Sequence, residues 1–223
     1  GGMAMVDRQA LELAGGLAAP VRIIPTAAAP DGNHARAGAN GVRWFRSLGA
    51  ADVESVALLD RDSASLPDIC AALRTARLVY LLGGFPGYLA QTLCETPAWQ
   101  AILEALQNGA VLGGSSAGAM VLCEHIFDPY NGAVVPGLGL LREVCVLPHH
   151  NTFGKSWAPR LKRLLPEALL VGIDEETGWL NDGPAGEWTV YGQGTVTVYK
   201  PEGPVALHHG ERFALPFSGE GQA

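Results

Sequence analysis

The sequence lacks the features that mark membrane-spanning, nucleic-acid-binding and metal-binding proteins. Its longest apolar runs, such as residues 78–82 and 168–173, have the length of strands and are far shorter than a membrane span. It contains no basic stripe and no cluster of aromatic residues with Arg, and its net charge is −7, so we expect no nucleic-acid partner. Its four cysteines form no CxxC or Cys/His pair, so we expect no metal site.

The cysteines and the start of the chain bear on the compartment. Cys70, Cys94, Cys123 and Cys145 are widely separated and mostly lie among apolar residues, which favours buried, reduced thiols. The first residues show no signal-peptide pattern. Both observations predict a cytoplasmic protein.

Most of the chain alternates between strand and helix patterns. Hydrophobic residues make up 48% of the 223 residues and charged residues 17%, which fits a sheet covered by helices. The alternation predicts βαβ crossovers, and therefore an α/β fold with a doubly wound, mostly parallel sheet and helices on both faces. Residues 187–200 are rich in β-branched and aromatic residues around a Gly-Gln-Gly segment, which predicts a C-terminal β-hairpin. We expect residues 1–223 to form a single domain.

The strongest chemical signal is the segment Gly114-Ser115-Ser116-Ala117-Gly118. It matches the G-x-S-x-G pattern and directly follows an apolar strand, which predicts a sharp strand-to-helix turn that exposes the Ser116 hydroxyl. The Ala117 N–H at the start of the next helix is the natural first donor to a developing oxyanion. A Gly/Ser turn needed only for packing is the alternative.

A second turn predicts the other oxyanion donor. Gly83-Gly84 also ends an apolar strand, and ligands of parallel sheets bind beyond the carboxyl ends of the strands. A glycine there allows backbone N–H groups to approach a substrate closely, so Gly84 is the candidate donor. A turn that merely requires a positive φ is the competing interpretation.

A nucleophilic serine also needs a base and an acid. His149 and His150 follow the apolar run at 144–148, and since successive side chains at a strand end face opposite sides, only one of them can meet the nucleophile. The residues alone do not choose between them. The acid that orients the imidazole is equally open, with these candidates: Glu124, Asp128, Asp174, Glu175 and Glu176.

Taken in order, five short motifs give the chain a family resemblance. These are Ile24-Pro25-Thr26-Ala27, Leu82-Gly83-Gly84, the Ser116 turn, Leu147-Pro148-His149 and Gly172-Ile173-Asp174-Glu175. Their order and spacing resemble the dipeptidase E and cyanophycinase family of serine peptidases, which have a class I glutamine-amidotransferase-like fold. The resemblance extends from residue 1 to about residue 199. Family members usually open with a strand that ends in Gly-Gly, and Gly1-Gly2 resembles that ending, so we expect that strand to be missing or very short here.

The resemblance implies roles for three residues. The family nucleophile corresponds to Ser116, and the family base in its Pro-His setting corresponds to His149, which leaves His150 as the non-catalytic neighbour. The family acid lies in the loop between these two residues, where Asp128 fits best and Glu124 is the reserve. Such a mechanism needs no cofactor.

Two departures from the family pattern concern the substrate. Phe85 stands where relatives carry Asn or Asp, and Trp157 stands three residues before Arg160, where acid-specific relatives carry a further Arg. An indole cannot bind a carboxylate as a guanidinium fork does, so strict Asp specificity is not expected. Phe85 and Trp157 favour a pocket for apolar or small side chains, with core packing as the alternative for both.

These observations predict a serine exopeptidase for dipeptides or short peptides. The alternatives are an esterase or amidase acting on a small metabolite, and a non-catalytic amidotransferase-like binding module. The expected partner is a small peptide substrate, and a homodimer is left open.

Overall fold

The computed structural model describes residues 3–215 of the chain, so Gly1 and Gly2, where a family strand was expected to end, lie outside the described residues. The helices are α1 (Met3–Leu13), α2 (His34–Ser47), α3 (Pro67–Arg74), α4 (Pro86–Leu93), α5 (Pro97–Gln107), α6 (Ala117–Met120) and α7 (Ala158–Leu164). The first strands are β1 (Val21–Ile24), β2 (Val53–Ser55), β3 (Leu78–Leu81), β4 (Val111–Gly114), β5 (His125–Asp128), β6 (Ala133–Pro136) and β7 (Val144–Leu147). The later strands are β8 (Leu169–Ile173), β9 (Thr177–Leu180), β10 (Trp188–Gly192), β11 (Val196–Lys200), β12 (Gly203–Leu207) and β13 (Arg212–Phe213).

A parallel sheet of four strands, in the order β2-β1-β3-β4, forms the N-terminal half of the fold. Side chains alternate across β3 as the pleat requires: Leu78 and Tyr80 pack into one core, and Val79 and Leu81 pack into the other. The first core also contains residues of α1 and α2, and the second contains residues of α3, α4 and α5. Helices therefore cover both faces, which confirms the predicted α/β class.

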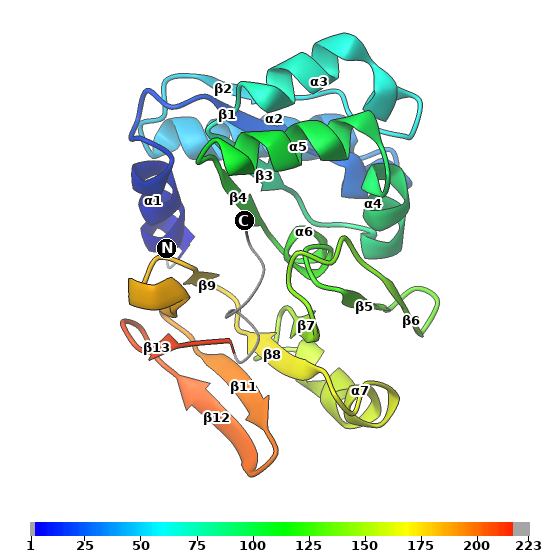
Figure 1. Ribbon diagram of the computed structural model, residues 1–223, viewed down its shortest axis with the longest axis vertical. Coiled ribbons are helices and arrows are strands. Elements are labelled where there is room, and N and C mark those ends of the chain that lie inside the picture. Colours follow the sequence, from blue (N-terminus) through cyan, green and yellow to red (C-terminus); the bar gives the residue numbers. More distant parts are fainter. Residues whose placement is uncertain (1–2, 216–223) are drawn as a thin grey trace.

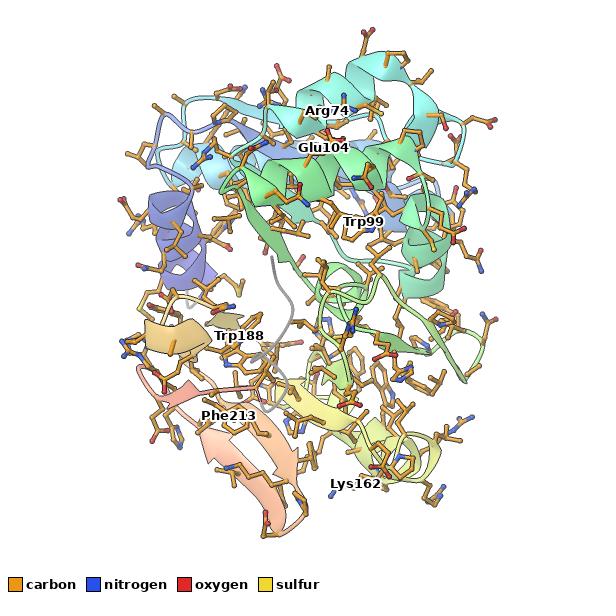
Figure 2. The ribbon with its side chains drawn as sticks, in the orientation of Figure 1. Arg74, Trp99, Glu104, Lys162, Trp188 and Phe213 are labelled. Carbon is orange, nitrogen blue, oxygen red and sulfur yellow. The ribbon has the colours of Figure 1, made fainter. Side chains whose placement is uncertain are left out.

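Helices α3 and α5 lie side by side on one face of this sheet (Figure 1). Arg74 on α3 and Glu104 on α5 form an ion pair between the two helices, and Figure 2 shows them close together. Helix α4 ends at Leu93 and Pro97 begins α5, where a proline is tolerated in the first helical turn.

The C-terminal strands are arranged differently from the predicted hairpin at 187–200. Both halves of that segment are strands, β10 and β11, but they do not pair with each other. β10 lies between β9 and β13, and β11 lies between β8 and β12, in each case with antiparallel partners. The C-terminal hairpin is instead formed by β11 and β12 (Figure 1). Strand β7 extends this second sheet by pairing parallel to β8.

The two larger sheets are separate in the described part of the chain. Among the described strands, β4 pairs only with β3 and β7 pairs only with β8. A cavity of about 1770 Å³ lies beside β4, and its lining also includes residues of β7, β8 and β9. None of the described helices has the length and hydropathy needed to span a membrane.

Candidate active site

Ser116 lies in a strained turn between β4 and α6. Its backbone has φ 51° and ψ −114°, a conformation that costs a non-glycine residue on the order of 1–3 kcal/mol and persists only where surrounding structure enforces it. The enforcing contacts come from close backbone packing. A Cβ on Gly114 would lie 2.4 Å from the Gly118 carbonyl carbon, and a Cβ on Gly118 would lie 2.1 Å from Leu81 O. Both outer glycines of the G-x-S-x-G pattern are therefore required by packing.

The Gly83-Gly84 turn lies directly against this serine. A Cβ on Gly83 would lie 3.1 Å from the Ser116 Cβ atom, and Gly84 has φ 141° with a potential Cβ position only 2.2 Å from Ala27 O. Among the described residues, neither the Gly84 N–H nor the Ala117 N–H donates a backbone hydrogen bond outside the regular helices and strands. The first N–H groups of a helix have no partner within it, so the Ala117 N–H remains free to bind an anion.

The structure places His149, and not His150, beside the serine. His149 Nε2 lies 3.0 Å from Ser116 Oγ, and His149 Nδ1 lies 3.1 Å from Glu175 Oε1. The His149 side chain is 33% exposed and that of Glu175 is 50% exposed, so a substrate can reach the pair. Ser116, His149 and Glu175 all border the cavity beside β4. The arrangement can deprotonate a serine hydroxyl and hold the resulting imidazolium beside a carboxylate.

Asp128, the sequence-based choice for the acid, is not brought to His149. Its buried carboxylate accepts hydrogen bonds from the Tyr130 N–H (2.9 Å) and from Asn131 Nδ2 (2.7 Å). These bonds organise the turn between β5 and β6, a common local use of Asp. The reserve candidate, Glu124, accepts a hydrogen bond from the Glu143 N–H. Glu175 was among the open candidates, and its signal was its place two residues after the apolar run that forms β8.

Aromatic side chains lie beside the Gly83-Gly84 turn and beside His149. Phe85, next to Gly84, stacks on the exposed ring of Tyr130 with 4.1 Å between ring centroids. The half-exposed ring of Phe153 stacks on the His149 imidazole, 4.9 Å away. Trp157 is half-buried and packs between Phe153 and Phe127, so it stabilises the position of the Phe153 ring.

Arg160 makes contacts within the protein in place of a contact with a substrate carboxylate. Its guanidinium donates to Gly132 O and lies over the Phe127 ring, 5.5 Å from the ring centroid. It therefore holds the β5–β6 turn against α7, and the same turn carries Tyr130.

Three of the cysteines are buried, as expected, and Cys94 is exposed; all four are free thiols. Burial raises the pKa of the Cys145 thiol to about 12 and also raises the pKa of the Cys123 thiol. Neither thiol can act as a nucleophile near neutral pH.

Comparison with known proteins gives the family. The chain belongs to peptidase family S51, whose model matches residues 3–182. A cyanophycinase from Trichormus variabilis is 31% identical over 212 residues, which cover 84% of this chain and 65% of that protein. A cyanophycinase from Geminocystis herdmanii is 32% identical over 216 residues, covering 89% of this chain and 75% of that protein. The crystal structure of a peptidase from an acI-B1 actinobacterium has a TM-score of 0.80 and 30% identity, covering 96% of this chain and 91% of that one.

Proposed function

We propose that this protein is a serine peptidase that hydrolyses dipeptides or short peptides, with Ser116 as nucleophile, His149 as base and Glu175 as the orienting acid. The observation that carries the proposal is the chain of contacts from Ser116 Oγ to His149 Nε2 (3.0 Å) and from His149 Nδ1 to Glu175 Oε1 (3.1 Å). Membership of family S51 supports the same reaction class. The four free thiols support a cytoplasmic setting.

Acylation follows from these contacts. His149 Nε2 accepts the hydroxyl proton while Ser116 Oγ attacks the peptide carbonyl carbon, and the carbonyl π electrons move to oxygen. The N–H groups of Gly84 and Ala117 are the proposed donors to this oxyanion. The carboxylate of Glu175 fixes the Nδ1–H tautomer and stabilises the imidazolium. When the tetrahedral intermediate collapses, the C–N bond breaks and His149 returns its proton to the leaving amine.

Deacylation repeats these steps with water in place of serine. Water loses a proton to His149 Nε2 and attacks the acyl carbon, and Ser116 leaves with that proton. The partly exposed imidazole leaves room for this water. No step requires a metal or an organic cofactor.

The surroundings of the nucleophile support a neutral substrate side chain. Phe85, which follows Gly84, stacks on Tyr130, and Phe153 stacks on His149, whereas Arg160 already binds Gly132 O. A substrate carboxylate placed against these rings would be desolvated without a cationic partner, which is costly. Phe85 therefore contacts the substrate in this proposal, while Trp157 and Arg160 act indirectly by supporting Phe153 and Tyr130.

Labelling with a fluorophosphonate tests the nucleophile. We expect the protein to react with the probe, and Ser116→Ala to abolish labelling and lower peptide turnover by about 10³-fold or more. Ser115→Ala, in the same turn, is the matched control and should still label. Near-normal peptide turnover in a folded Ser116→Ala protein would refute the mechanism. A wild-type protein that does not label would favour the binding-module alternative, and hydrolysis of esters but not peptides would favour the esterase.

A peptide panel tests the substrate preference. Peptides that differ only in the residue before the scissile bond should be cleaved at least about tenfold faster with Leu or Phe than with Asp, because the neighbouring aromatic rings are uncharged and Arg160 already binds Gly132 O. Arg160→Met should leave the Leu/Asp ratio of kcat/KM unchanged. A strong preference for Asp that Arg160→Met removes would show that Arg160 recognises the substrate.

A further inference from the structure

A second histidine–carboxylate pair lies next to the proposed catalytic pair, on the interior side. His150 and Asp174 are the chain neighbours of His149 and Glu175, and His150 Nδ1 lies 3.4 Å from Asp174 Oδ1. The two pairs differ in burial: the side chains of His150 and Asp174 are 6% and 12% exposed, whereas those of His149 and Glu175 are 33% and 50% exposed. Each of the two dipeptides thus places one residue in the proposed catalytic chain and its chain neighbour in the interior.

The inner pair is tied to the C-terminal hairpin. Tyr199 OH, on β11, lies 2.8 Å from His150 Nε2, and Asp174 Oδ2 accepts hydrogen bonds from the Thr195 N–H and hydroxyl, both at 2.9 Å. Lys162 lies on α7 (Figure 2). Its Nζ atom lies 5.0 Å from the centroid of the Tyr199 ring. We call His150, Asp174, Thr195 and Tyr199 the inner clamp.

Proton positions in the clamp form one consistent set. Burial has the largest effect on the pKa of His150 and lowers it below the ordinary value. The Asp174 carboxylate raises this pKa and the Lys155 charge lowers it further, and the net direction is down. The imidazole is therefore neutral near pH 7. A neutral ring has one donor and one acceptor. Nδ1–H then faces Asp174 Oδ1 at 3.4 Å, and Nε2 accepts from the Tyr199 hydroxyl. Each side chain of the buried pair therefore has polar partners on the hairpin and on the other member of the pair, which restricts its movement.

The clamp holds the backbone that carries the proposed base. His149 has φ 52°, a left-handed conformation that is uncommon for residues other than glycine and is stabilised by neighbouring contacts. The next residue supplies such contacts: the His150 N–H donates to Ile173 O (3.0 Å), and a Cβ on Gly172 would lie 2.2 Å from His150 Cδ2. The His150 ring is therefore wedged against β8 and cannot shift without moving His149.

We propose that His150, Asp174 and Tyr199 are positioning residues that set the distance between His149, Glu175 and Ser116; the inference rests on the proposed function. Tyr199 and Thr195 lie outside residues 3–182, the segment matched by the family model. The C-terminal hairpin thereby contributes to catalysis without touching the substrate.

Substitutions at Asp174 separate positioning from charge. Asp174→Leu removes the polar contacts of residue 174 with His150 and Thr195. Asp174→Asn keeps them, because the Asn carbonyl can accept from Thr195 while the Asn amide donates to His150 Nδ1 when that imidazole carries its proton on Nε2. We expect Asp174→Leu to lower kcat at least about tenfold with KM nearly unchanged, since small misplacements of a catalytic group are costly. Asp174→Asn should stay within about threefold of wild type.

A pair of tyrosines provides the matched control. Tyr199→Phe removes one hydroxyl group from the clamp. Tyr191→Phe removes a hydroxyl group on β10, outside the clamp, that donates to Asp182 Oδ2. Tyr199→Phe should lower both kcat and the fluorophosphonate labelling rate about three- to tenfold, and Tyr191→Phe should change neither. Because Tyr199→Phe is a small change, it decides the question even if Asp174→Leu does not fold.

A readout without turnover keeps the clamp and the proposed function distinguishable. The His149 Nδ1–H proton, identified by its loss in His149→Ala, should give a resolved NMR resonance in wild type and a broadened one in Tyr199→Phe. If Ser116→Ala retains labelling, or wild type does not label, the proposed function fails and the NMR comparison alone decides the clamp. The clamp is refuted if Tyr199→Phe keeps the wild-type resonance and rates, or if Tyr191→Phe lowers the rates equally.

Discussion

Asp7 is a buried acid whose charge weakens the folded protein at neutral pH. It lies on α1 with 3% of its surface exposed, and its Oδ2 accepts a hydrogen bond from Trp44 Nε1 (2.7 Å). Burial raises the pKa of Asp7 from 3.8 to about 6, against the opposing effect of hydrogen bonds from Trp44 and Tyr80. The folded state therefore binds a proton that the unfolded chain releases above about pH 4.

The cost follows from the size of this change. One pKa unit corresponds to about 1.4 kcal/mol, so a rise from 3.8 to about 6 destabilises the folded protein by about 3 kcal/mol above pH 6. The cost is absent below pH 4, where both states are protonated, and grows as the pH rises between these values. Asp7→Asn removes the charge and keeps a carbonyl oxygen for Trp44. We expect it to stabilise the protein by about 3 kcal/mol at pH 7.5 and by little at pH 4.

Unfolding measurements at the two pH values test this expectation. For a chain of this length, about 3 kcal/mol corresponds to a Tm increase of roughly 6–12 °C at pH 7.5. Asp62→Asn is the control, because Asp62 is exposed and makes no side-chain capping bond. It should change the stability at neither pH. A stability gain of equal size at pH 4 and pH 7.5, or a loss at pH 7.5, would refute the assignment of the cost to the buried charge.

Three further predictions concern the catalytic groups. Glu175→Gln should lower kcat by about 10²-fold or more, whereas Asp128→Asn should leave kcat nearly unchanged and destabilise the protein by about 1 kcal/mol through the β5–β6 turn. Steady-state kinetics measure kcat and urea unfolding measures the stability. A large loss of kcat in Asp128→Asn with little loss in Glu175→Gln would show that Asp128 is the acid. His149→Ala should be nearly as damaging as Ser116→Ala, because the two act as one unit, whereas His150→Ala should retain far more activity; equal losses in the two histidine variants would contradict this assignment. Dialysis against EDTA should leave peptide turnover unchanged, and a loss that added metal restores would show that the mechanism is incomplete.

Local patterns predicted the elements of the parallel sheet because their signals are local. The alternation of apolar strands with helices can be recognised without knowing any long-range contact. The glycines around Ser116 are similar, since their spacing reflects close packing within one strand–turn–helix unit.

Strand pairing after residue 187 could not be predicted in the same way. The Gly-Gln-Gly segment resembles a hairpin turn, but its glycines serve close approach to another loop. A Cβ on Gly192 would lie 2.2 Å from Glu176 O, and a Cβ on Gly194 would lie 2.6 Å from the Asp174 Cβ atom. Gln193 N–H also donates to Glu176 O. These long-range contacts direct β10 toward β9 and β11 toward β8, and no local pattern reveals them.

The choice of acid shows how far adjacency in sequence can constrain a site. Side chains of consecutive residues at a strand end alternate, so if His149 faces Ser116, then His150 must face away. The same rule applies to Asp174 and Glu175 after β8, and since β7 and β8 pair in parallel, the two dipeptides meet at one edge of the sheet. Each histidine must then face one of the two acids. What the sequence could not supply was the pairing of β7 with β8; without it, Asp128 was as reasonable an acid as Glu175.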